Sequence, residues 1–168
     1  YTYADVASRS DGVAMELQSA GIGRGHRVGI LLYKSFDAVC AIFGVLKAGA
    51  VYVALNPGQN GSQLNDIISD ARLSALIAND STAVIAGNLV HATPHILHMS
   101  DRGDIHIPGT EPYIAEIEEP NSPKDFCSID YSGAIGRPGG GVLHTQESIT
   151  SCIEWCYQTI APYSYDRL

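Results

Sequence analysis

Short apolar runs alternate with segments of helical periodicity along residues 1–100 of this chain. Each run is nearly continuous in Val, Ile, Leu and Ala, which is typical of strands that are buried on both faces. The intervening segments are long enough for a helix to connect one strand to the next. The pattern predicts an α/β fold in which helices flank a mostly parallel sheet. The four runs occupy residues 27–33, 50–55, 74–78 and 95–99.

Residues with known preferences for helix ends mark the helical segments. Thr2 and Ser35 precede apolar-periodic stretches and are expected N-caps, while Gly21 and Gly49 suit the left-handed position after a helix. Helices are expected over residues 2–20, 35–48, 62–71, 81–88 and 146–160. The apolar face of the second helix is expected to comprise Val39, Ile42, Phe43 and Leu46, and that of the last helix Ile149, Cys152, Ile153, Cys156 and Ile160.

Residues 100–125 interrupt this alternation and are expected to form a surface connection. The stretch is rich in proline and in acidic residues, which break regular structure and favour solvent. Order is expected to return over residues 126–168, as a strand, a glycine-rich loop, a second strand and a helix.

The charge balance excludes several classes of partner. The formal net charge is −8, from 18 acidic and 10 basic residues. Nucleic-acid binding without sequence preference needs a basic surface, and so does docking on an anionic membrane. No apolar run is long enough to span a bilayer. The four cysteines are far apart or at helical spacing, so they are expected to be reduced core thiols of a cytoplasmic protein.

A glycine-rich loop over residues 132–141 separates the last two predicted strands. Glycines permit positive φ and let several backbone N–H groups point at one anion, so this arrangement can cradle phosphate. The Walker pattern does not occur, and a glycine-rich loop alone is more often only a turn. The candidate cofactor-binding residues are Ser132, Gly133, Gly136, Gly139 and Gly140.

Three segments together resemble the AMP-forming, adenylate-forming superfamily. From Tyr131, YSGAIGRPGGGV resembles the phosphate-loop motif Y-T-S-G-[ST]-T-G-x-P-K-G-V. Upstream, TYADV at residues 2–6 resembles T-Y-x-E-L, and LKAGAVYVALNP at residues 46–57 resembles L-K-A-G-A-x-Y-V-P-L-D-P. The superfamily includes acyl-CoA synthetases, luciferases and the adenylation domains of nonribosomal peptide synthetases. The resemblance covers essentially the whole chain and implies the first subdomain of the family's large domain.

The loop departs from the family pattern in the side chains that handle phosphate. Gly139 or Gly140 stands where the family has a lysine, and Ala134 and Ile135 replace two hydroxyl residues. The changes remove a mobile positive charge and two hydrogen-bond donors, and Ile135 places apolar bulk beside charged oxygens. Weak anion binding without adenylation chemistry is therefore expected at this loop.

The family's remaining functional residues follow the phosphate loop: a magnesium-binding acid, a ribose-binding aspartate, the substrate pocket and a catalytic lysine. None can be assigned within residues 1–168, so the resemblance implies a truncated adenylation domain. For the isolated chain we expect no catalytic residue, no metal ligand and no cofactor.

Three hypotheses for function follow from the resemblance. The first is a degenerate pseudo-domain with a structural or docking role in a multidomain synthetase. The second is an N-terminal fragment of an active adenylation domain or acyl-CoA ligase, which would use ATP and magnesium. The third is nucleotide binding without chemistry. We also expect an exposed apolar face that packs on a neighbouring domain of the same synthetase or on a second copy.

Several other polar residues invite a functional interpretation and are assigned structural roles. On a strand His95 and His98 face opposite sides, so with His91 they are expected at the surface rather than at a metal. Cys152 and Cys156 lack two further ligands and are expected in the core. His144 is expected to pack rather than to catalyse, and the acids of the connection, Glu116, Glu118 and Glu119, to be solvated.

Overall fold

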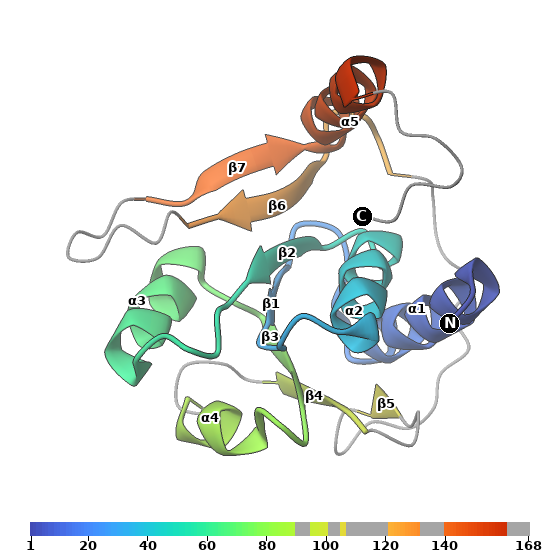
Figure 1. The fold of residues 1–168 in the computed structure, drawn as a ribbon. Helices are drawn as coiled ribbons and strands as arrows, with labels where there is room; N and C mark the ends of the chain where they lie inside the picture. Colours follow the sequence, from blue (N-terminus) through green and yellow to red (C-terminus); the bar gives the residue numbers. More distant parts are fainter. Residues whose placement is uncertain (90–94, 101–104, 107–120, 132–139, 161–168) are drawn as a thin grey trace.

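The computed structural model describes residues 1–89, 95–100, 105–106, 121–131 and 140–160. Its strands are β1 (Arg27–Ile30), β2 (Val51–Ala54), β3 (Ala75–Asn79), β4 (His95–Met99), β5 (Ile105–His106), β6 (Phe126–Asp130) and β7 (Val142–Thr145). They form one sheet in the order β5-β4-β3-β1-β2-β6-β7 (Figure 1). The five inner strands run parallel, whereas β5 and β7 are antiparallel to their neighbours. The predicted α/β fold with a mostly parallel sheet is confirmed.

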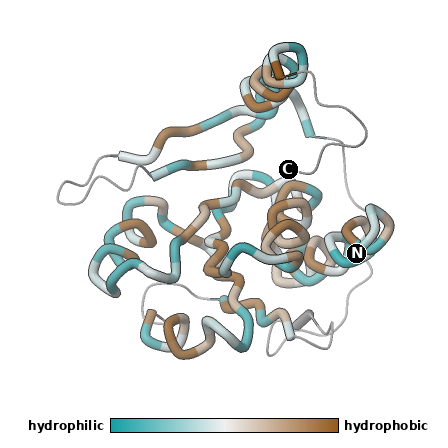
Figure 2. Tube along the Cα trace, in the orientation of Figure 1, coloured by the Kyte–Doolittle hydropathy of each residue, from teal (hydrophilic) through white to brown (hydrophobic). Residues whose placement is uncertain are grey.

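Helices cover both faces of this sheet. The described helices are α1 (Tyr3–Ser19), α2 (Phe36–Lys47), α3 (Gly61–Ala71), α4 (Ala83–Asn88) and α5 (Gln146–Ile160), of which α1 to α4 form these layers. One hydrophobic core lies between the sheet and the α1–α2 pair, and a second lies between the sheet and α3 with α4. Figure 2 shows hydrophobic residues concentrated in the central strands and in the helix faces turned towards them. The helices α2, α3 and α4 each connect two parallel strands, as the alternating pattern predicts.

The helix ends follow from local hydrogen bonding. The Thr2 hydroxyl accepts a hydrogen bond from the Asp5 amide at 3.2 Å, and the Ser35 hydroxyl accepts one from the Ala38 amide at 3.2 Å. Gly21, just after α1, has a φ of +73°, a conformation in which glycine carries no steric cost. The predicted caps Thr2 and Ser35 and the predicted role of Gly21 are confirmed.

The prediction of which residues of α2 are buried is wrong. Val39 and Phe43 are 43% and 48% exposed, whereas the buried residues are Cys40, Ala41, Gly44 and Val45. The reason is the close approach of α1: a Cβ added to Gly44 would collide with the Val13 side chain. A helix packed this tightly presents its small residues to its neighbour, and its larger apolar residues are left facing outward.

The predicted burial of α5 is also wrong. The helix spans the predicted residues, but none of its residues is buried; Cys152 is exposed and Cys156 is half-buried. Figure 1 shows the reason: α5 follows β7 at the end of the sheet, away from both helix layers. The expectation of an exposed apolar face is met here, with Ile153 and Ile160 62% and 67% exposed.

Part of the predicted connection over residues 100–125 contains regular structure that the sequence did not predict. β5 lies within it and pairs with β4 through His98–His106 and Met99–Ile105. Residues 101–104 and 107–120, with Glu116, Glu118 and Glu119, lie outside the described residues. None of the described helices is long and apolar enough to cross a membrane.

Candidate functional site

The glycine-rich loop connects the carboxyl end of β6 to β7. In open parallel sheets this end of the strands is where ligands bind. Residues 132–139, which include the candidates Ser132, Gly133, Gly136 and Gly139, lie outside the described residues. Gly140 is described and exposed, with no atom within 4 Å of an added Cβ. The structure therefore defines how the two ends of the loop are held.

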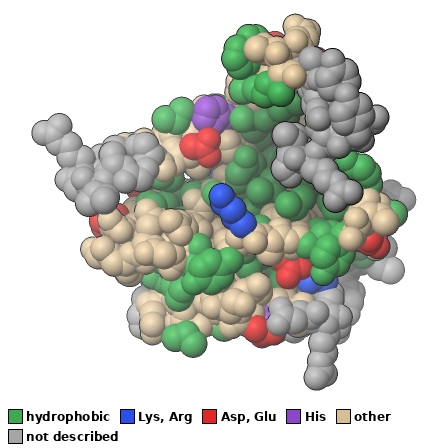
Figure 3. Space-filling model, in the orientation of Figure 1, with side chains coloured by type: hydrophobic (Ala, Val, Ile, Leu, Met, Phe, Trp, Pro, Cys, Tyr) green, Lys and Arg blue, Asp and Glu red, His purple; other side chains and the backbone are tan. Residues whose placement is uncertain are grey.

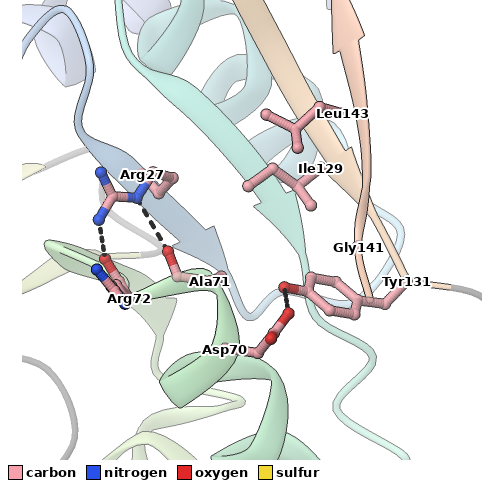
Figure 4. Close-up of a pocket in the computed structure, with 8 residues that line it drawn as sticks. All are labelled: Arg27, Asp70, Ala71, Arg72, Ile129, Tyr131, Gly141 and Leu143. Atoms are coloured by element: carbon pink, nitrogen blue, oxygen red, sulfur yellow. Dashed lines mark hydrogen bonds between the residues drawn. The ribbon is translucent and has the colours of Figure 1, made fainter. Parts of the chain in front are cut away.

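Both ends meet at one contact, which we call the loop clamp and which consists of Asp70, Tyr131 and Gly141. The Tyr131 hydroxyl donates a hydrogen bond to Asp70 Oδ2 at 2.6 Å, across from the end of α3 (Figure 4). Gly141 lies against the Tyr131 ring, and a Cβ added there would be 2.8 Å from Tyr131 Cζ and would collide with Ile129. The residue before the loop is thus fixed both to α3 and to the residue that ends the loop.

The protonation of the clamp favours this hydrogen bond. Burial raises the pKa of Tyr131, and the hydrogen bond and negative charge of Asp70 raise it further. The phenol therefore stays protonated and donates to the carboxylate, which is the stronger, charge-assisted form of such a contact. The hydroxyl is a structural donor and is not available as a base.

A cavity of about 260 Å³ lies beside the clamp, between α3 and the β6–β7 hairpin. Figure 4 shows its polar wall, in which the Arg27 guanidinium points at the end of α3. Arg27 Nε donates to the Ala71 carbonyl at 2.9 Å and Arg27 Nη2 to the Arg72 carbonyl at 2.7 Å. Cationic donors at a helix C-terminus compensate the helix dipole. The cavity is lined by Arg27, Asp70, Ala71, Arg72, Ile129, Tyr131, Gly141 and Leu143.

None of the described residues at the two ends of the loop is a cation that could hold a nucleotide phosphate. The charged groups at the two ends of the loop are the carboxylates of Asp70 and Asp130, which repel an anion. In the adjoining cavity the Arg27 guanidinium is committed to backbone carbonyls, and the second arginine of the lining is Arg72. The lysine of the family pattern is absent from the loop, whose sequence over residues 132–141 has Arg137 as its one basic residue. We derive no chemical step through ATP or magnesium at this site.

The opposite face of the hairpin brings Ser128, Asp130 and His144 close together. His144 Nε2 lies 3.2 Å from Asp130 Oδ2, and Ser128 is directly opposite His144 in the strand register. The trio has the residue types of a nucleophilic site, but Ser128 is fully buried and no substrate can reach it. His144 is half-buried and lies beside the Asp130 carboxylate, and its expected role in packing rather than catalysis stays a prediction.

The remaining candidates have structural roles or surface positions. Cys40 and Cys127 are buried, and burial raises the pKa of both thiols, as is typical of unreactive core cysteines. His98 Nε2 lies 3.0 Å from Asp80 Oδ1, and His95 is half-buried on the other side of β4. His91 lies outside the described residues. No group of three metal-ligating side chains occurs in the part of the chain that the structure describes.

Sequence reasoning missed Asp70 and Arg27 as parts of this site. Asp70 and Tyr131 are 61 positions apart, and no local motif joins them. Arg27 is the first residue of β1. It reaches the carbonyls at the end of α3 because α3 leads into β3, the strand that pairs with β1. The signal in the sequence was limited to Tyr131, the residue before the glycine-rich loop.

Comparison with known families decides the classification. The sequence profile described as "AMP-binding enzyme" matches residues 1–167. The chain belongs to the AMP-binding enzyme family. The resemblance of its three sequence segments to adenylate-forming enzymes is confirmed, because the match spans all of them.

Curated relatives of this AMP-binding family member include large biosynthetic enzymes. Malpinin synthetase of Mortierella alpina is 29% identical over 167 residues, which cover 99% of this chain and 2% of that protein. Zwittermicin A synthase ZmaJ of Bacillus cereus is 29% identical over 174 residues, covering 99% of this chain and 30% of ZmaJ. The chain thus spans 2% to 30% of the length of these two relatives.

Solved structures of other proteins share the fold described above. VinN superposes with a TM-score of 0.76 at 25% identity, over 99% of this chain and 42% of VinN. Apo MatB from Rhodopseudomonas palustris gives a TM-score of 0.75 at 22% identity, over 95% of this chain and 32% of MatB. At that identity the MatB likeness concerns the fold alone.

Proposed function

We propose that this chain is a non-catalytic adenylation pseudo-domain with a structural or docking role inside a multidomain synthetase. One observation carries the proposal: the loop keeps its glycines but lacks the side chains that handle phosphate. Ala134 and Ile135 replace the family's hydroxyl residues, and Gly139 or Gly140 replaces its lysine. The backbone material for weak anion binding at the loop is retained without the groups that would make it catalytic.

The expected effect on chemistry is large. Removing a single preorganised donor from an oxyanion site typically lowers the rate by about 10²–10³-fold. Relative to the family pattern this loop lacks two hydroxyl donors and the lysine and keeps Arg137, and the carboxylates of Asp70 and Asp130 beside the loop ends have the wrong sign to bind phosphate. Phosphoryl and nucleotidyl transfer depend mainly on positioning and charge stabilisation, so little catalysis is expected to remain.

The exposed apolar surface supports the docking role. Figure 3 shows hydrophobic side chains along α5 and on the face between the β6–β7 hairpin and α2. Trp155 and Tyr157 on α5 are each 64% exposed, and Val142 and Leu143 on β7 are 57% and 51% exposed. Clusters of large apolar side chains at a surface mark protein contacts. A neighbouring domain of the same synthetase is the proposed occupant, with self-association as the alternative, and the free cysteines suit the cytoplasm.

The test is carboxylate-dependent exchange between ATP and pyrophosphate, measured with the chain in its natural full-length protein. No exchange is expected above a no-enzyme control with amino, aryl or acyl acids. Exchange that is lost on deleting this segment would refute the proposal. A loop variant combining Ala134→Thr, Ile135→Thr and Gly139→Lys provides the positive arm: it should gain an ATP-dependent rise in Tm that the natural sequence lacks. If the natural loop binds a nucleotide but the protein shows no exchange, the hypothesis of nucleotide binding without chemistry is selected instead.

The second candidate is the N-terminal part of an active ATP-dependent adenylation domain or acyl-CoA ligase. The match over residues 1–167 and the shared fold with VinN favour it. In that case ATP and magnesium would be the cofactors of the whole domain, and residues outside this chain would supply the missing donors. Exchange in the full-length protein that survives Gly139→Lys and stops on deletion of residues 132–141 would select this candidate.

A further inference from the structure

Two thiols lie one turn apart on α5. Cys152 is exposed, Cys156 is half-buried, and both are free. Residues four apart on a helix are neighbours on its surface, with Cβ atoms about 5–6 Å apart. The thiols interact: after burial, the charge and hydrogen bonding of Cys152 raise the pKa of Cys156. The helix therefore holds two sulfur atoms close enough to act together.

We propose that Cys152 and Cys156 form a dithiol site that binds a soft, thiophilic ion through both sulfurs. A disulfide needs Cβ atoms about 3.5–4.5 Å apart, which is closer than the helix spacing allows without distortion. An ion with bonds to sulfur of about 2.3 Å spans the larger gap and leaves the helix intact. The geometry thus favours chelation over oxidation.

The surroundings of the pair select the class of ion. Thiolates bind zinc, cadmium and trivalent arsenic in preference to magnesium or calcium, which need oxygen ligands. On the same side of the helix the neighbours Ile149, Ile153 and Ile160 are apolar. No third His, Cys, Asp or Glu joins the pair within the described residues. A trivalent arsenical with one organic substituent needs only two protein ligands, so it matches the donor set best.

Binding should depend on pH in a defined direction. When the bound group is a metal dication such as zinc or cadmium, each sulfur releases its proton to solvent, so the affinity for these ions rises with pH. The raised pKa of Cys156 moves this dependence to higher pH than two isolated thiols would show. The site does not depend on whether the glycine-rich loop binds a nucleotide, so the thiol adduct and ATP–pyrophosphate exchange are independent readouts.

Phenylarsine oxide is the probe. Both As–S bonds form as the two thiol protons leave with the arsenic-bound oxygen as water, so arsenic stays trivalent and no oxidant is needed. Under native conditions in excess monothiol, which displaces single As–S bonds but not a chelate, one adduct per chain is expected by intact mass. Excess dithiothreitol should remove it, and the far-ultraviolet circular dichroism should show α5 retained.

Matched variants decide between chelation and adventitious labelling. Cys152→Ser or Cys156→Ser alone should abolish the monothiol-resistant adduct, whereas Cys40→Ala and Cys127→Ala should keep it. Combining Cys156→Ser with Glu154→Cys keeps two thiols on α5 but puts them on opposite sides of the helix, and the adduct should be lost. An adduct that survives in either single serine variant, or none in the natural chain, would overturn the proposal.

Discussion

Gly141 is the residue at which the loop clamp is most sensitive to a single added methyl group. In Gly141→Ala the new Cβ would collide with Ile129 and lie 2.8 Å from Tyr131 Cζ and 3.0 Å from its hydroxyl oxygen. Carbon atoms in favourable contact are about 3.5–4.0 Å apart. Ile129 is 7% exposed and packs in the α3-side core, and Tyr131 is held by Asp70, so neither side chain can easily move away.

The expected cost is that of overpacking a well-packed site, about 1–3 kcal/mol. For a domain of this size each kcal/mol lowers the Tm by about 2–4 °C, so a fall of about 2–12 °C is expected. Thermal and urea unfolding, followed by far-ultraviolet circular dichroism, measure this loss of stability. The urea midpoint should fall with an unchanged m-value.

The neighbouring glycine supplies the control. A Cβ added to Gly140 has no atom within 4 Å, so Gly140→Ala should change stability by less than about 0.5 kcal/mol. Gly141 is not among the glycines with positive φ, so backbone strain does not separate the two variants. Equal Tm values for Gly140→Ala and Gly141→Ala would show that Tyr131 does not pack on the end of the loop.

Three further perturbations test the contacts around this hairpin and the core. Because the raised pKa of Tyr131 means that the folded chain holds this proton more tightly than the unfolded chain, its contribution to stability is complete below about pH 10 and is lost as the pH rises towards the folded-state pKa. Tyr131→Phe should therefore cost about 1 kcal/mol at pH 8, and the difference from the natural chain in urea unfolding should shrink above about pH 10. Arg27→Met removes three hydrogen bonds to carbonyls and should cost about 1–3 kcal/mol in the same assay, with Arg27→Lys intermediate. Gly44→Ala would force α1 and α2 apart at Val13 and should lower the Tm by several degrees, whereas Gly87→Ala, with open space around it, should not.

Regular elements with strong local signals were predictable from the sequence. Apolar periodicity and turn signals in the sequence correctly predict the strands near residues 27–33 and 126–131 and the helix over residues 146–160. The errors concern which face of a helix is buried. Phe43 and Cys152 both lie on apolar stripes, yet Phe43 faces outward because α1 takes the small-residue side of α2, and Cys152 does so because α5 leaves the helix layers.

The site was predictable only in part for a related reason. A glycine-rich stretch between two strand signals identifies the loop, because glycine has a local conformational preference. The residues that hold the loop come from elsewhere: Asp70 lies in the last turn of α3, and it reaches Tyr131 only because α3 crosses back along the sheet. Tertiary proximity of this kind leaves no periodic trace in a single sequence.

The pairing of β2 with β6 has a mechanical consequence. One register pair, Tyr52 with Ser128, joins these strands in the described sheet, whereas four pairs join β1 to β2. In contrast, several register pairs join β6 to β7, and α5 follows β7 directly in the chain. Opening at the β2–β6 seam would therefore also require the Tyr131–Asp70 hydrogen bond to break, and it would then move the hairpin and α5 together while the core of β1, β2 and β3 stays closed.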